Sequence, residues 1–437
     1  MSLATPASVQ KLQTVLHAKA KEAPGFRFYA LYDKVYREDV LAFAYQCCQA
    51  NGGAAGVDGQ SFEDIQTYGV ERWRDELAQE LKSRTYQPLP VRRVYIPKPA
   101  GGQRPLGIPA IRDRVVETAA VLVLEPIFEA DLPPEQYAYR RDRGALDAVR
   151  EVHELIDTGY GEVVDADLSS YFDSLPHAEL LKSVARRVVD GAMLHLIKMW
   201  LNAPIEETDE RGNTHRSTRN RDEGRGTPQG SPISPLLSNL YMRRFVLGWK
   251  KLGHEQRLKA RIVNYADDLV ICCRGGGAQA LAAMRDMMRK LRLTVNDTKT
   301  RVCKLPEEKF NFLGYTFGRY YSPRTGRPYL GVTPSKQRVQ RVCEAISQTT
   351  RRSQTQRDAG TLVASLNRLA IGWANYFRLG RVNKAYRAVD RHTRRRLRQW
   401  LCAKHKLRGV GTLRYPDDLL HDEFGLVRLV TRTASLP

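Results

Sequence analysis

The chain has 437 residues, of which 42% are hydrophobic, and 70 Lys and Arg against 48 Asp and Glu give it a formal net charge of +22. This length allows two or three domains, and the composition excludes a disordered chain. No apolar run is long enough to cross a bilayer, and the N-terminal segment lacks the apolar stretch of a secretory signal. The positive charge favours a polyanionic partner, with nucleic acid ahead of an anionic membrane surface.

The first third of the chain predicts helices around one hairpin. Residues 1–50 have apolar positions at helical spacing, and a Gly-rich loop follows at 51–61. The segment 62–86 has the pattern of one polar helix. Residues 91–110 alternate like two strands on either side of a Gly-Gly turn, and 111–130 have the composition of a buried helix.

The middle third mixes strands and helices. A strand is expected at 161–168, helical structure at 176–203, and a loop or an exposed hairpin at 206–226. Two prolines open a predicted helix over 231–252, and residues 278–295 have the pattern of a helix that leads into a strand.

The last part of the chain is a basic helical module. From about residue 334 the apolar positions recur only at helical spacing. Between Lys336 and Arg408 there are 19 Lys and Arg against three acids. Basic helices with so few acids favour contact with a phosphate backbone, which gives salt-dependent affinity with little sequence specificity.

The seven cysteines indicate a reduced protein. None belongs to a C-x-x-C pair, and Cys47–Cys48 and Cys272–Cys273 are direct neighbours, which suits neither ordinary disulfides nor a zinc site. We therefore expect a reduced, intracellular protein that is cytoplasmic and has no structural zinc.

The stretch RIVNYADDLVICC, residues 261–273, sets two adjacent carboxylates between two apolar runs. The runs have the pattern of buried strands, and Asp267 and Asp268 lie at the turn between them. Adjacent anions repel, so such a pair is kept in open solvent or against a cation. A solvated hairpin turn and a cation site both remain open from this stretch alone.

A second acidic stretch, VVDADLSSYFDS, ends the strand expected at 161–168. Period-two alternation predicts that Asp165 and Asp167 share one face of the sheet. A fold could bring Asp167 beside the carboxylates at 267 and 268. Two or three convergent carboxylates are the usual way to hold the pair of divalent ions that serves phosphoryl transfer.

The order of these motifs resembles that of reverse transcriptases. The successive matches are IPKPAGGQRPLGIP, DADLSSYFD, GTPQGSPISPLLSNLYM, YADD, LTVNDTKT and FNFLGYTF. Within that family the chain most resembles the reverse transcriptases of bacterial group II introns, whose maturase region contains sequence similar to GWANYFR. The resemblance implies an α/β right-hand polymerase fold, with fingers and palm, followed by an all-α thumb and maturase region.

The resemblance implies an RNA-directed DNA polymerase that uses two Mg²⁺ ions, with Mn²⁺ as an alternative metal. The implied metal ligands are Asp167, Asp267 and Asp268, assisted by the backbone carbonyl of Leu168. Asp165 and Asp173 match no chemical role in the family. The implied partners are an RNA template, a DNA or RNA primer, deoxynucleoside triphosphates and structured intron RNA, with no membrane; the oligomeric state is left open.

Five further residues carry roles by resemblance. Lys98 and Arg104 match the finger hairpin that grips the triphosphate, and Gln229 matches a contact to the incoming nucleotide. Phe172 matches the ring that excludes a 2′-hydroxyl, and Lys299 matches the lysine that protonates the departing pyrophosphate. Four of the five have a plainer alternative, namely a solvated basic surface for the two lysines and Arg104, or core packing for Phe172.

The expected division has four parts. Residues 1–90 form an N-terminal helical extension and the start of the fingers, 91–330 the fingers and palm, 331–410 the basic α-helical thumb and maturase region, and 411–437 a short tail. Two rival functions stay open: an RNA-binding splicing cofactor without significant polymerase activity, and a domesticated reverse transcriptase in phage defence.

Overall fold

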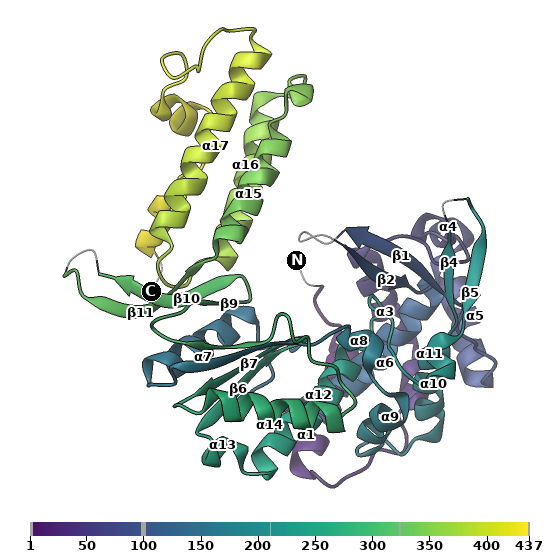
Figure 1. Cartoon of the computed structure of the whole chain (residues 1–437). Coiled ribbons are helices and arrows are strands. Elements are labelled where there is room, and N and C mark those ends of the chain that lie inside the picture. Colours follow the sequence, from purple (N-terminus) through teal and green to yellow (C-terminus); the bar gives the residue numbers. More distant parts are fainter. Residues whose placement is uncertain (1–2, 98–101, 210, 323–324, 436–437) are drawn as a thin grey trace.

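A central antiparallel sheet organises the fold (Figure 1). The computed structural model describes residues 3–97, 102–209, 211–322 and 325–435. The sheet has the strand order β6-β7-β3-β8. Its strands are β3 (Glu162–Asp167), β6 (Ala260–Tyr265), β7 (Asp268–Cys273) and β8 (Arg301–Lys304). The strand predicted at 161–168 and the two strands predicted around the Asp267–Asp268 turn are therefore confirmed.

Both faces of the central sheet are buried. Alternation along β3 sends Val164 to the main core, which includes residues of α12 (Ser234–Lys251) and α14 (Gly277–Lys290). Val163 points the other way, into a second core with α7 (Ala145–Asp157) and the small sheet β11-β10-β9. Residues of that small sheet are β9 (Phe310–Phe312), β10 (Tyr315–Tyr321) and β11 (Pro328–Pro334).

The N-terminal part contains a second four-stranded sheet, which we call the N-terminal sheet, of order β2-β1-β4-β5. Its strands are β1 (Val91–Pro97), β2 (Gln103–Ile108), β4 (Ile205–Thr208) and β5 (Thr214–Ser217). The hairpin predicted over 91–110 is confirmed, and the segment 206–226 contains the exposed hairpin of β4 and β5. The helices of the N-terminal part include α1 (Ala7–Glu22), α2 (Tyr32–Val35), α3 (Glu38–Asn51) and α6 (Ile111–Glu129), and α6 contacts each of the other three.

Two predicted helices are each divided in the structure. The polar helix expected over 62–86 is α4 (Phe62–Tyr68) followed by α5 (Val70–Ser83). Gly69 lies between them with φ 106°, a backbone angle that favours glycine and interrupts the helix. The helical stretch expected over 176–203 is likewise α9 (His177–Ala185) and α10 (Gly191–Asn202). Short helices occur at α8 (Tyr171–Ser174), α11 (Arg219–Asp222) and α13 (His254–Arg257).

Helix α1 is hydrogen-bonded to an irregular point of α6. Pro126 lies inside α6 and has no N–H, so the carbonyl of Leu122 lacks its usual helical donor. The side-chain amide of Gln13 on α1 donates to that carbonyl at 3.1 Å. Gln13 is itself buried, so the bond replaces a donor where water has little access.

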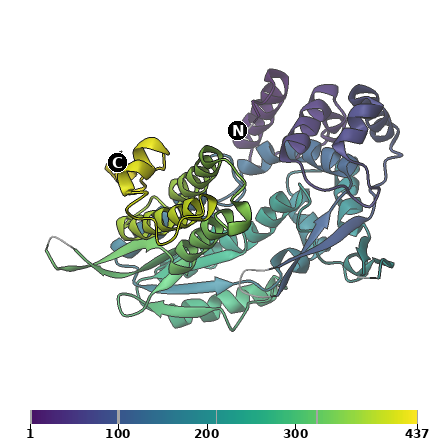
Figure 2. The same ribbon diagram turned by 90° about the horizontal axis from the view of Figure 1, so that it is seen from above.

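The C-terminal helical unit, residues 336–435, stands over the small sheet β11-β10-β9 (Figures 1 and 2). It contains α15 (Lys336–Thr349), η1 (Arg352–Gln354), α16 (Ala359–Tyr376), α17 (Asn383–Lys404), η2 (Leu419–Glu423) and η3 (Val430–Ser435). Leu366 and Trp400 lie in a core of its own, and Leu420 and Leu429 fold back into that core. The helices predicted after 334 are confirmed.

Candidate active site

The turn between β6 and β7 presents the two adjacent carboxylates at the end of the central sheet. Ala266 adopts a left-handed backbone, with φ 56°, so that the strands are joined by a turn of two residues. The side-chain amide of Asn264 donates to the carbonyls of Ala266 at 2.9 Å and Asp268 at 3.3 Å. These bonds hold the turn that carries Asp267.

Asp167 ends β3 directly opposite Asp268 in the antiparallel register. Side chains in opposed positions share a face, so Asp165 lies on that face as well, as the alternation predicts. The Asp167 carboxylate accepts hydrogen bonds from the Asn296 amide at 2.9 Å and from the Lys299 ammonium at 3.3 Å. The structure thus brings Lys299 to Asp167, the acid that lies opposite Asp268.

The acids at this edge repel one another. Asp268 is an exposed residue, but many protein atoms surround its carboxyl group at the end of the sheet. The resulting loss of hydration, and then the charges of Asp267, Asp167 and Asp165, raise the pKa of Asp268 to about 7, against a smaller opposing effect of Lys299. A bound cation would relieve this repulsion.

The donor chemistry of this edge fits a hard divalent ion. Carboxylate oxygens are the ligands that Mg²⁺ prefers, and it retains several waters, so a few protein oxygens suffice. Next to Leu168, the Asp167 carbonyl accepts a hydrogen bond from the Asn296 amide, and the Ser169 amide donates to the Thr294 carbonyl. Neither bond uses the Leu168 carbonyl, so these bonds leave it available as a metal ligand. Within the described ranges, no three His, Cys, Asp or Glu side chains already form a metal-binding cluster.

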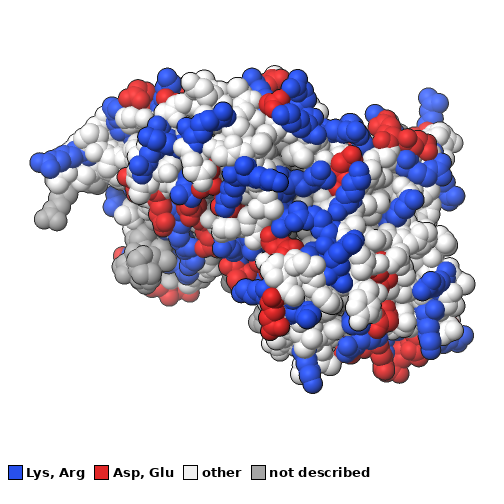
Figure 3. All heavy atoms as spheres, turned by 90° about the horizontal axis from the view of Figure 1, so that it is seen from below, with Lys and Arg blue, Asp and Glu red and all other residues white. Residues whose placement is uncertain are grey.

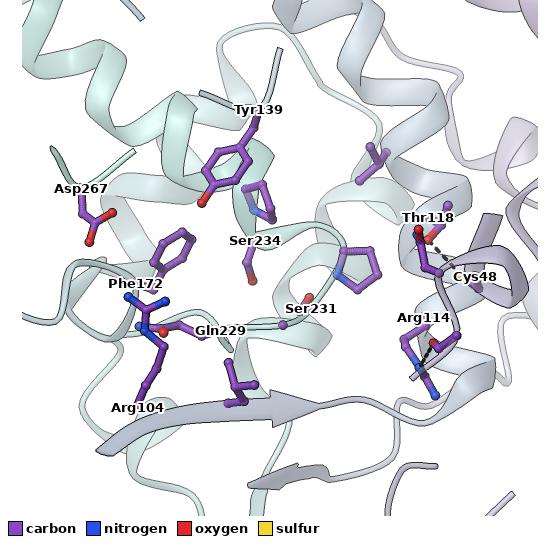
Figure 4. Close-up of a pocket in the computed structure, with 17 residues that line it drawn as sticks. Cys48, Arg104, Arg114, Thr118, Tyr139, Phe172, Gln229, Ser231, Ser234 and Asp267 are labelled. Carbon is purple, nitrogen blue, oxygen red and sulfur yellow. Dashed lines mark hydrogen bonds between the residues drawn. The ribbon is translucent and has the colours of Figure 1, made fainter. Parts of the chain in front are cut away.

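A cavity of about 650 Å³ opens beside these carboxylates (Figure 4). Arg104 of β2, Phe172 of α8, Gln229 and Asp267 all line it. Four predicted residues from separate parts of the chain therefore meet around one space. Lys98 lies outside the described residues, so its prediction stays untested.

Phe172 lines the cavity, and its ring packs against the buried neighbour Tyr171. It is half-buried, and its ring packs edge-on against Tyr171, with 5.8 Å between the ring centroids. Tyr171 is buried and its hydroxyl donates to the Ser238 carbonyl at 2.7 Å, so Tyr171 belongs to the core. Of these two neighbouring rings, it is that of Phe172 that lines the cavity.

The loop that carries Gln229 is attached to strand β2. The amide of Gly107 donates to the Gln229 carbonyl at 2.7 Å, and the Ser234 hydroxyl donates to the Pro228 carbonyl at 2.9 Å. Gly230 has φ 117°, and a Cβ there would lie only 2.5 Å from the Gly107 carbonyl oxygen. Glycine is therefore required for this close approach.

A buried acid beneath this loop was not anticipated from the sequence. Glu117 of α6 is 3% exposed, and its carboxyl accepts a hydrogen bond from the Ser231 hydroxyl. Burial raises the pKa of Glu117 to about 8, so the group is largely protonated at neutral pH. An acid inside the apolar run RVVETAAVLVL is the signal that could have found it.

Basic side chains are abundant on the surface. Figure 3 views the molecule from below and shows Lys and Arg scattered among acidic and uncharged residues. On α17 an exposed stripe, which we call the α17 stripe, has helical spacing and consists of Lys384, Arg387, Arg391 and Arg395. Among the described residues, none of these four forms an ion pair or a side-chain hydrogen bond.

Two family models match the chain. The model for reverse transcriptase (RNA-dependent DNA polymerase) matches residues 96–317, and the model for the group II intron maturase-specific domain matches 339–415. Protein YkfC of Escherichia coli K12 is 34% identical over 346 residues, which cover 70% of this chain and 87% of that protein. The fold class is therefore as expected, with α/β fingers and palm before an all-α thumb.

More distant relatives are larger proteins. Group II intron-encoded protein LtrA of Lactococcus lactis is 32% identical over 51% of this chain and 36% of its own length. The putative COX1/OXI3 intron 1 protein of Saccharomyces cerevisiae is 26% identical over 63% of this chain and 38% of its own. The chain thus spans little more than a third of these two relatives.

A solved structure titled "Partial Cas6-RT-Cas1--Cas2 complex" aligns with 60% of this chain and 41% of that chain, at 20% identity and a TM-score of 0.35. Among the described residues, no helix is long and apolar enough to span a membrane. The reverse transcriptase model covers half of the chain and the maturase model follows it. The chain belongs to the reverse transcriptase family, in the group II intron branch that carries a maturase domain.

Proposed function

We propose that this chain is an active RNA-directed DNA polymerase that adds deoxynucleotides to a primer 3′-hydroxyl on an RNA template. The observation that carries the proposal is the meeting of Asp167, Asp267 and Asp268 at one sheet edge, beside a cavity lined by Arg104 and Phe172. An acidic edge next to a basic, ring-lined cavity suits a substrate that has phosphates at one end and a sugar and base at the other.

The acids would hold two Mg²⁺ ions, or Mn²⁺ in their place, with help from the Leu168 carbonyl. When bound, such ions supply positive charge that activates the primer hydroxyl and stabilises the leaving pyrophosphate. The raised pKa of Asp268 supports this assignment, because loss of hydration and then the charges of the neighbouring acids disfavour its ionised form, and a bound cation offsets both effects.

The remaining residues would bind and orient the nucleotide. Arg104 offers a two-pronged guanidinium to the triphosphate, with Lys98 as its proposed partner. Gln229 contacts the nucleotide from the loop fastened to β2, and the Phe172 ring leaves no room for a 2′-hydroxyl. Lys299 is exposed at its head and 3.3 Å from Asp167, so it is available to give a proton to departing pyrophosphate.

A second role is proposed for the C-terminal helical unit, namely binding intron RNA and assisting its splicing. Two observations favour it, the maturase-specific match over 339–415 and the unpaired α17 stripe. Unpaired exposed cations attract phosphate without reading sequence, so this surface suits a large folded RNA.

The test extends a DNA primer on an RNA template with Mg²⁺ and deoxynucleotides, comparing the native chain with Asp267→Ala. Extension that is lost in the variant, while RNA binding persists, supports polymerase chemistry at this turn. Tight RNA binding by a native chain that never extends the primer would overturn the proposal and leave the splicing role. Splicing of an intron RNA by Asp267→Ala would then separate the two functions.

A further inference from the structure

Tyr139 is an exposed aromatic residue with a strained backbone in the cavity wall. It follows α6 on the loop that leads to α7 and also lines the 650 Å³ cavity. Its φ is 56°, a left-handed angle that is unfavourable for an aromatic residue, and its side chain is 48% exposed. An exposed tyrosine gains nothing from core packing that would offset this angle.

The residues on both sides of Tyr139 are held firmly. The Asn239 amide, on α12, donates to the Ala138 carbonyl at 2.7 Å, and both Ala138 and Asn239 are buried. The Arg140 guanidinium donates to the Gln136 carbonyl at 2.9 Å. With the backbone fixed before and after it, Tyr139 keeps the left-handed conformation, and strain maintained in this way is typical of functional positions.

The side chain points at the reacting edge. In Figure 4 the Tyr139 hydroxyl is directed towards the space between Asp267 and Phe172. Partial burial first, and then the negative charge of Asp267, raise the pKa of the Tyr139 hydroxyl, so the group remains a protonated donor at neutral pH. The ring and Phe172 thus bound the cavity next to the acids.

We propose that Tyr139 is a positioning residue whose ring forms the wall opposite Phe172 and holds the sugar and base of the incoming deoxynucleotide beside Asp267. This inference rests on the proposed polymerase function. A flat ring offers apolar area at small entropic cost, and two rings facing one another restrict the tilt of a bound nucleotide. The hydroxyl points towards the acids and makes a smaller contribution than the ring.

The test measures kcat and KM for a deoxynucleotide at saturating template and primer. Tyr139→Ala removes the ring, and we expect KM to rise about tenfold or more while kcat changes about threefold or less. Tyr139→Phe keeps the ring, so its KM is expected within about twofold of native. Tyr29→Ala removes a tyrosine that is 73% exposed and outside the cavity lining, and serves as the matched control.

Tyr139→Gly separates positioning from folding. Glycine accepts a left-handed backbone freely, so this variant is expected to unfold at the same or a higher temperature than Tyr139→Ala. Its KM is nevertheless expected to rise as much as in Tyr139→Ala. A merely structural role would instead give Tyr139→Gly a native KM, and that result overturns the proposal.

The remaining outcomes are also decisive. A Tyr139→Phe variant with the full rise in KM would show that the hydroxyl, and not the ring, holds the nucleotide. Native KM values in both Tyr139→Ala and Tyr139→Gly would remove Tyr139 from the site while native extension keeps the polymerase proposal intact. Failure of the native chain to extend any primer concerns the polymerase proposal itself.

Discussion

The cavity beside the central sheet and the C-terminal helical unit use polar side chains in opposite ways. Around the cavity, the polar groups that support its wall are buried and paired with partners far away in sequence, as Glu117 is with Ser231 and Asn239 with Ala138. On α17 the charged stripe is exposed and unpaired. A single substitution at the cavity should therefore have a large effect on primer extension. Substitutions in the stripe should lower RNA affinity by small steps that depend on the salt concentration.

The largest effect is expected at the turn between β6 and β7. Asp267→Asn should lower the rate of primer extension by about a thousandfold or more, since it removes a proposed metal ligand. The loss of a like charge beside Asp268 should leave the unfolding temperature unchanged or higher. Rapid-mixing extension assays and thermal unfolding measure both quantities.

The control for this variant is Asp297→Asn. Asp297 is exposed and paired with Arg285 away from the cavity, so its removal should leave extension close to native. Extension by Asp267→Asn at the native rate would contradict the assignment of this acid.

Arg104 should show the next largest effect. Arg104→Ala should raise KM for deoxynucleotides about tenfold, because the cavity loses the guanidinium that we propose binds the triphosphate. Arg104→Lys should recover part of this loss, since an ammonium keeps the charge without the two-pronged geometry. Steady-state kinetics at saturating template and primer provide the measurement.

Arg216→Ala is a suitable comparison for Arg104→Ala. Arg216 lies on β5 of the N-terminal sheet, to which β2 with Arg104 also belongs. It pairs with Glu206 at 2.7 Å and does not line the 650 Å³ cavity. An equal rise in KM in both variants would mean that general basic charge, and not the position of Arg104, binds the nucleotide.

The α17 stripe should respond to salt. Replacing Lys384, Arg387, Arg391 and Arg395 with Gln should lower RNA affinity and reduce the salt slope of log Kd by about one for each lost phosphate contact. Extension at saturating RNA should change little. RNA titrations between low and moderate salt measure the slope.

Two other α17 arginines provide a contrast on the same helix. Arg394 and Arg398 both pair with Asp417, so Gln at these positions should lower the unfolding temperature more than it changes the salt slope. An unchanged salt slope in the four-residue variant would show that the stripe is an ordinary solvated surface.

The smallest effect concerns pH. The Glu117 carboxyl has a pKa of about 8 in the folded protein and an ordinary value of 4.5. Between these two pH values the folded protein keeps the proton on Glu117, whereas the unfolded chain loses it. The contribution of this group to stability therefore falls as the pH rises from about 5 to 8. Glu117→Gln keeps an acceptor for the Ser231 hydroxyl. In this variant the fall in unfolding temperature between pH 5 and pH 8 should be smaller than in the native protein by about 3 degrees.

Glu117→Gln has an internal comparison, because Asp113 has a pKa raised to about 6 by burial and contributes a similar but earlier decline. The Gln variant should keep the part of the decline below about pH 6. An identical pH profile in the native and Glu117→Gln proteins would mean that this carboxyl ionises normally.

Local patterns in the sequence were sufficient for much of the site. The turn with Asp267 and the strand that ends at Asp167 are each built from neighbours in the chain, so alternation and turn chemistry predict them. Arg104 and Phe172 could be identified from motif resemblance, which also implied their shared location. The cavity then brings them together.

The features that the sequence did not predict depend on distant contacts. Glu117 is buried because the Ser231 loop covers it, and the strained Tyr139 is held through Asn239, about 100 residues later. The division of the expected helix over 62–86 depends on the backbone angle of Gly69, since a glycine within a helical pattern does not always interrupt it. Such outcomes are decided by tertiary structure.

The bond from Gln13 to the Leu122 carbonyl has a practical consequence for anyone who alters the start of the chain. Helix α6 supports Glu117 and lines the cavity with Arg114 and Thr118, and one of its internal carbonyls relies on a donor from α1. A tag fused close to Ala7, or a deletion of α1, is therefore expected to disturb the 650 Å³ cavity even though α1 contributes no side chain to its lining. A kinetic constant measured on such a variant should be compared with that of the native chain before it is assigned to a residue of the cavity.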